Sequence, residues 1–162
     1  MKLHVLVLLV VMTFSFQAKA EIVINLPFPF YSTTTIKTPT VFRMDKNPIA
    51  MEVLDTSYPK SLMNVCKNDM QIALQVWKAT LKQMQSYAQA VNFPLDGTKM
   101  WIKVYCNKKG KIKHIAFLPT PDSKNIPEGF TEGFLERFMK KYKMQIKAKM
   151  DFSHYGIASF PL

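Results

Sequence analysis

The chain has 162 residues, carries a formal net charge of +11 at pH 7 and is 48% hydrophobic. This length supports one domain with a hydrophobic core and excludes two domains of ordinary size. The excess of positive charge suits contact with nucleic acid, anionic lipid or an acidic protein, and equally suits a solvated face that binds nothing.

Residues 1–20 are typical of a secretory signal peptide. Lys2 precedes an apolar run from Val5 to Met12 that continues loosely to Phe16, and Ala18-Lys19-Ala20 offers a small-residue cleavage site. The run is shorter than the roughly 20 apolar residues that span a bilayer, so we expect cleavage rather than the alternative, a retained membrane anchor. The mature protein is then expected to be soluble and periplasmic or secreted, with a charge of +9 because cleavage removes two of 22 basic residues and no acid. Export makes nucleic acid the least expected partner.

Residues 21–66 are predicted to form an extended lead segment with short strands. Val41–Met44 and Ile49–Leu54 lie on either side of a predicted turn at residues 45–48. No long helix fits this segment because prolines interrupt it repeatedly, at Pro27, Pro29, Pro39, Pro48 and Pro59.

Two cysteines, Cys66 and Cys106, remain after the signal peptide. A disulfide between them is one interpretation, because disulfides persist in exported proteins. Two buried free thiols are the other interpretation, because cysteine is among the most buried residue types.

A long amphipathic helix is predicted from Asn68 to just before Pro94. Asn68 and Gln71 have the spacing of a capping pair. The apolar residues then recur at steps of three and four, which predicts one buried face: Met70, Ala73, Trp77, Leu81, Met84, Ala88 and Val91.

The clearest predicted hairpin covers Lys99–Leu118. Its first strand alternates apolar and polar residues up to Cys106, and a turn at 107–110 ends at Gly110. Ile112 and Ile115 are three residues apart rather than two, which predicts a β-bulge in the return strand.

A second helix is predicted from about Pro127 to Lys143, followed by a last strand at 156–160. Pro127 suits a first helical turn. The predicted buried stripe of this helix consists of Phe130, Phe134, Leu135, Phe138, Met139 and Tyr142. The fold class expected from these elements is α+β, with a small antiparallel sheet of hairpin and C-terminal strand packed against two helices.

No catalytic residue, metal ligand set or cofactor motif is predicted. After the signal peptide the sequence has two histidines, His114 and His154, and it lacks the common hydrolase, metal and phosphate-loop motifs. Cys106 and His114 lie eight positions apart around the hairpin, a spacing that fits accident better than a nucleophile and its base. We therefore expect a protein that is not an enzyme and has no cofactor.

The segments WIKVYCNKKGKIKHIAFLP, FTEGFLERFMKKYKM and GIASF together resemble the periplasmic C-terminal domain of the TonB family, the energy transducers of Gram-negative outer-membrane transport. The resemblance covers residues of about 99–160, where Gly110, Ile112, Ile115 and Phe117 match the glycine and apolar pattern of the family's second strand. It implies an α+β domain at 67–162. The family's membrane anchor and proline-rich spacer have no counterpart in the expected mature chain.

What the resemblance implies about function is recognition by strand addition at the last strand. An extended peptide of a protein partner, an outer-membrane receptor in the family, would pair with that edge, and a second copy of the chain could pair there too. The expected partner-binding residues are Ile157, Ala158, Ser159 and Phe160. The alternative is a secreted effector or inhibitor that binds an acidic target through a basic face at Lys108, Lys109, Lys111 and Lys113.

Overall fold

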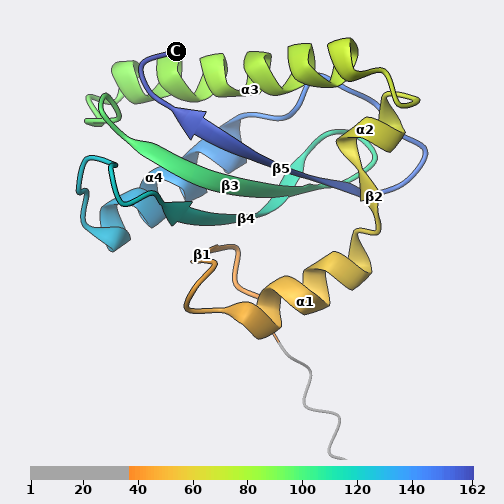
Figure 1. Cartoon of the computed structure of the whole chain (residues 1–162), viewed down its shortest axis with the longest axis horizontal. Coiled ribbons are helices and arrows are strands. Elements are labelled where there is room, and N and C mark those ends of the chain that lie inside the picture. The colour runs from red at the N-terminus through yellow and green to blue at the C-terminus, as the bar shows by residue number, and fades with distance from the viewer. Residues whose placement is uncertain (1–36) are drawn as a thin grey trace, which may run out of the picture. The chain divides into compact units, whose positions relative to one another are not determined.

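The computed structural model of the protein describes residues 37–162 (Figure 1). The predicted signal peptide and the first part of the lead segment lie outside the described residues. The strands are β1 (Val41–Arg43), β2 (Lys60–Ser61), β3 (Lys99–Cys106), β4 (Ile112–Pro119) and β5 (Phe152–Ser159). The helices are α1 (Pro48–Ser57), α2 (Leu62–Val65), α3 (Met70–Ala90) and α4 (Glu128–Lys141).

The five strands form one mixed sheet in the order β1-β4-β3-β5-β2. The antiparallel centre consists of β4, β3 and β5, so the predicted α+β sheet of hairpin and C-terminal strand is confirmed. β1 adds to β4, and β2 adds to β5, both in parallel. The lead segment was predicted to end at residue 66, outside the domain, yet from β1 onward it belongs to the same sheet.

The prediction of a strand at Ile49–Leu54 is wrong, because these residues lie in α1. Pro48 occupies the first turn of the helix and Asn47 precedes it. Ala50 and Leu54, four residues apart, are the buried residues of α1, which is the spacing of a helical face. Pro48 in the first turn and the four-residue spacing of Ala50 and Leu54 therefore indicate a helix.

The long helix is confirmed as α3, although its N-cap lies one residue later than the predicted cap, Asn68. Asp69 is the N-cap, and its carboxylate accepts a hydrogen bond from the main-chain N–H of Ile72 at 3.0 Å. Asn68 lies before the helix with φ +62°, a left-handed conformation that asparagine tolerates. Met70 and Val91, at the two ends of the predicted stripe, are exposed.

The hairpin and its bulge are confirmed. Tyr105 pairs with His114 and Cys106 pairs with Ile112, so Lys113 is the extra residue of the return strand. Gly110 has φ +78°, and a Cβ there would lie 2.3 Å from the carbonyl oxygen of Met144. Glycine is therefore required both by the conformation of the turn and by the segment that packs against it.

The second predicted helix is confirmed as α4, with one error in its buried stripe. Phe134, Leu135, Phe138 and Met139 are buried, but Phe130 is 69% exposed. Steps of four residues turn the helix by about 400°, so a stripe written in fours drifts by about 40° per step. Thr131, rather than Phe130, takes the buried position in the first turn.

The two faces of the sheet are covered differently. α3 and α4 pack on one face, where their apolar residues and those of β3, β4 and β5 form the larger core. α1 packs on the other face over Phe42, Tyr105 and Ala116. In Figure 1, α1 lies beside β1, the edge strand on the far side of the sheet from β5 and β2. Beside β5 this second face is partly open, because Trp101, Tyr155 and Ile157 are exposed there.

A polar contact holds α1 on the sheet. The hydroxyl of Tyr105 donates to a carboxylate oxygen of Asp55 at 2.9 Å, and the ammonium of Lys103 lies 2.6 Å from the same oxygen. Burial, followed by this hydrogen bond, raises the pKa of Tyr105 far above its usual value. The hydroxyl therefore remains a donor at any physiological pH.

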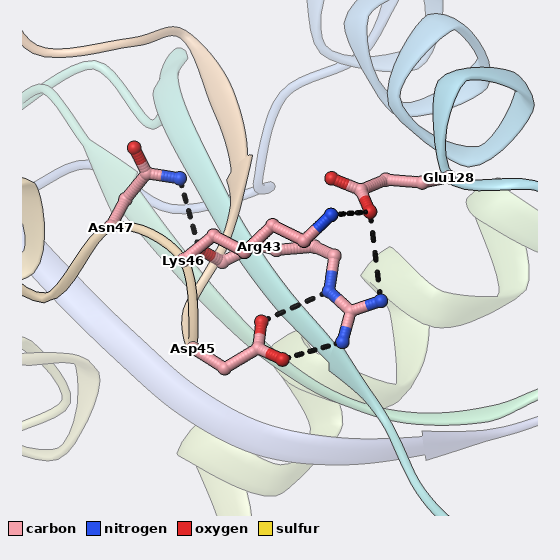
Figure 2. A network of polar contacts seen from close by, with 5 residues as sticks. All are labelled: Arg43, Asp45, Lys46, Asn47 and Glu128. Carbon is pink, nitrogen blue, oxygen red and sulfur yellow. Dashed lines mark hydrogen bonds and ion pairs between the residues drawn. The ribbon is translucent and has the colours of Figure 1, made fainter.

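A second polar network joins the turn after β1 to the start of α4 (Figure 2). The guanidinium of Arg43 makes two hydrogen bonds to the carboxylate of Asp45 and lies 3.6 Å from Glu128. Lys46 also contacts Glu128. Hydrogen bonding to Arg43 lowers the pKa of Asp45. This network orients the first turn of α4 relative to β1.

The two cysteines are free thiols, so the disulfide interpretation is not the one found in the structure. Both side chains are buried in the larger core. The sulfur of Cys106 lies 3.6 Å from that of Met144, where it packs as a small apolar group.

Candidate functional site

The outer edge of β5 is covered over a small part of its length. β2 pairs with Phe152 and Ser153. Within residues 37–162, no strand pairs with that edge from His154 to Ser159. An unpaired edge presents main-chain N–H and C=O groups that can pair with another chain.

The register of β5 against β3 shows which residues present these groups. Just beyond the strand, the N–H of Phe160 donates to the carbonyl of Thr98 at 2.9 Å, so Phe160 bonds inward. Inward and outward residues alternate in an antiparallel pair. The main-chain N–H and C=O groups of His154, Gly156 and Ala158 therefore point inward, toward β3. Those of Tyr155, Ile157 and Ser159 point outward, toward the free edge.

The predicted partner-binding residues divide into two pairs. Ile157, which is 41% exposed, and Ser159 have outward main-chain groups and exposed side chains. Ala158 and Phe160 are buried in the core and bond inward, so they present neither a side chain nor a main-chain group to the outer edge. The predicted strand at 156–160 in fact begins at Phe152, which adds Tyr155 to the outward residues.

An apolar surface adjoins this edge on the open face of the sheet. Trp101 is the cross-strand partner of Ile157 and is 37% exposed. The ring of Trp101 stacks on that of Tyr155, with centroids 5.2 Å apart and planes 9° apart. These three side chains, Trp101, Tyr155 and Ile157, are called the open-face patch below. The alternation of β3 indicated that Trp101 faces away from the core, but the partial cover by α1 could not be predicted.

The opposite side of the same strand is fixed firmly against α3. The ring of His154 lies 4.6 Å from that of Trp77, and burial lowers the pKa of His154 to about 4. A Cβ at Gly156 would lie 2.9 Å from Nε1 of Trp77, so the strand backbone approaches the indole closely there. The strand that carries the free edge is therefore packed closely against α3.

The predicted basic face lies at the other end of β5, around the hairpin turn. Lys108, Lys109, Lys111 and Lys113 are all exposed. The structure brings further lysines to the same end from α4, from the segment before β5, and from β2 and the turn before α3: Lys140, Lys141, Lys143, Lys147, Lys149, Lys60 and Lys67. The predicted basic face included none of these seven lysines, because their elements meet the hairpin turn only through tertiary contacts.

Cys106 and His114 do not form a nucleophile–base pair. Cys106 faces the larger core, where burial raises the pKa of its thiol to about 12. The bulge places His114 on the other face, with Nδ1 2.8 Å from the carbonyl oxygen of Pro39. Within the described residues there is no cluster of three or more histidine, cysteine or acidic side chains suited to a metal ion.

Comparisons of the chain with models of protein families, with curated proteins and with solved structures found no match. The resemblance to the TonB C-terminal domain therefore stays a prediction from the residues. Within residues 37–162, no helix is both long enough and apolar enough to cross a bilayer.

Proposed function

We propose that this protein is an exported, non-enzymatic module that binds an extended segment of a protein partner by strand addition to β5. The observation that carries this proposal is the outer edge from His154 to Ser159, which no strand of the described residues covers. Its outward groups belong to Tyr155, Ile157 and Ser159. The predicted signal peptide supports export, and the resemblance to the TonB family supports a receptor segment as the partner.

The open-face patch would supply selectivity. A strand that pairs with β5 directs every second side chain to the face that carries Trp101, Tyr155 and Ile157. We therefore expect partner segments with aromatic or branched apolar residues at alternate positions. Main-chain hydrogen bonds would supply affinity that does not depend on the partner's sequence, and contacts with the open-face patch would favour particular sequences.

Proline substitution tests the edge without disturbing the sheet. The N–H of Ser159 and that of Ile157 point away from β3, so Ser159→Pro and Ile157→Pro remove a donor from the edge and no donor from the β3–β5 ladder. Ser159→Ala and Ile157→Thr are the matched controls, because they change the same side chains and keep the N–H.

The probe is a random library of 12-residue peptides, selected on the wild-type chain and measured individually by fluorescence polarisation. Each proline variant is expected to weaken the selected peptides by about tenfold or more, since a main-chain bond is lost and the added strand is displaced. The controls should stay within about threefold, and affinity should survive moderate salt. Equal affinities for Ser159→Pro and Ser159→Ala would overturn the proposal.

A second copy of the chain is another occupant that the same variants test. If β5 pairs with β5 of a copy, sedimentation should show a dimer for the wild type and a monomer for Ser159→Pro. In that case peptide binding should compete with dimerisation.

A further inference from the structure

The lysines of the predicted basic face and the seven further lysines brought to the same end of β5, together called the basic end, form a continuous surface. Neighbouring shallow concavities share its lysines: Lys143 lines two of them, and Lys147 lines two. None of the lysines named for this end takes part in an ion pair within residues 37–162, whereas Lys46, Lys99 and Lys103 do. Within residues 37–162, the one acidic side chain bonded at this end is Asp151, and its carboxylate accepts from a main-chain N–H rather than pairing with a lysine ammonium.

Main-chain hydrogen bonds hold these lysines on a fixed platform. The N–H of Met144 donates to the carbonyl of Gly110 at 2.9 Å, and the N–H of Ala148 donates to that of Lys108 at 2.8 Å. A carboxylate oxygen of Asp151 accepts from the N–H of Lys108 at 2.9 Å. The hairpin turn and the segment before β5 are thus tied together, and their lysines point outward from one rigid surface.

An apolar groove lies within this basic surface. It has a volume of about 590 Å³, with Lys60, Lys67, Lys147 and Lys149 around it. Its apolar lining is Val65, Ala148 and Met150, and Met150 is 47% exposed. A flexible thioether surrounded by ammonium groups on aliphatic stems suits the boundary between lipid headgroups and acyl chains.

We propose that the basic end binds an anionic lipid surface, with Met150 at the headgroup level and the surrounding lysines on lipid phosphates. Each lysine near such a surface contributes attraction that adds to that of the others. β5 runs away from this end, so its free edge would extend from the membrane (Figure 1). The proposal rests on charge and the groove, and does not depend on strand addition.

The same residues fit other polyanions less well. Binding of single-stranded nucleic acid combines a basic groove with aromatic side chains on which bases stack, whereas Tyr142 at the margin of this surface is already stacked on Phe138 at 5.0 Å. Protein interfaces are depleted in lysine. Binding to an anionic bilayer needs neither bidentate hydrogen bonds nor a matching cleft, so a broad surface of lysines is sufficient for it.

Vesicle co-sedimentation tests the proposal with the chain expressed from Met1 and purified in the form that the cell accumulates. Vesicles of phosphatidylcholine alone are compared with vesicles that also contain phosphatidylglycerol. The wild type should bind the second kind and be released by about 0.5 M salt. The double variant Lys147→Glu/Lys149→Glu should lower the partition coefficient onto these vesicles by about tenfold or more. Met150→Gln should lower it by a smaller factor.

The matched control is Lys78→Glu/Lys82→Glu, which makes the same change of net charge at exposed lysines of α3 away from the basic end. All variants keep residues 1–36, so any contribution of that segment is common to them. A second pair, Lys109→Glu/Lys143→Glu, repeats the test on other elements if the first pair fails to fold.

Equal loss in the basic-end and control variants would show an effect of net charge alone and would overturn the proposal. Equal binding to both kinds of vesicle, or to neither, would also overturn it. Tighter binding to an acidic peptide or to single-stranded DNA than to anionic vesicles would assign the basic end to that partner instead.

Discussion

Gly110→Ala should destabilise the protein far more than an ordinary glycine substitution. The left-handed conformation, φ +78°, costs an alanine about 1–2 kcal/mol. The new Cβ would also lie 2.3 Å from the carbonyl oxygen of Met144 and 2.8 Å from that of Ile146. Moving this segment away would break hydrogen bonds of Met144 to Gly110 and of Ala148 to Lys108, at about 1 kcal/mol each. The total expected loss is about 3–4 kcal/mol.

Gly97→Ala provides the control for this prediction. Gly97 also has a positive φ, +83°, but a Cβ there would meet nothing closer than the side chain of Lys124 at 3.5 Å. Its expected cost is the conformational one alone, about 1–2 kcal/mol. In urea unfolding followed by circular dichroism, a difference of about 2 kcal/mol separates the two midpoints by about 1 M. Midpoints that fall by the same amount would refute the steric argument at Gly110.

Three further outcomes follow from the buried groups. Cys106 and Cys66 should both be unreactive to a thiol reagent at pH 8 in the native protein, since burial raises the pKa of each, and both should react after unfolding without reductant. His154 has a pKa of about 4 in the folded protein, below its unfolded value of about 6.5, so the unfolded chain binds more protons between these pH values. The free energy of unfolding should therefore fall by about 2 kcal/mol from pH 7 to pH 5, and it should fall less in His154→Gln. Asp55→Asn should lower the unfolding free energy by about 1–2 kcal/mol. Asp122→Asn, in an exposed ion pair, should leave the unfolding free energy nearly unchanged, and thermal unfolding compares the two variants.

Local signals explain what could be predicted of the fold. The hairpin follows from alternation and from Gly110 in a turn, and its bulge from the three-residue step between Ile112 and Ile115. α3 follows from a long apolar period. Each signal lies within one element and its immediate neighbours, which is why sequence reasoning found these elements.

The parts that failed depend on contacts between distant segments. β2 is two exposed residues, Lys60–Ser61, and nothing in their pattern distinguishes them from a loop until β5 is beside them. At the candidate edge, the last strand was predicted, but which residues point outward depends on its register with β3. The prediction therefore included Ala158 and Phe160, which bond inward, and did not include Tyr155 and Trp101.

Amide hydrogen exchange along β5, measured by NMR, shows whether the outer edge of this strand is free and whether a bound peptide covers it. In the free protein we expect slow exchange at His154, Gly156 and Ala158, whose N–H groups point toward β3. We expect fast exchange at Tyr155 and Ile157, whose N–H groups point outward. Addition of a selected peptide should slow the two outward amides and leave the inward ones unchanged. Outward amides that are already slow in the free protein, or that stay fast with saturating peptide, would contradict strand addition at β5.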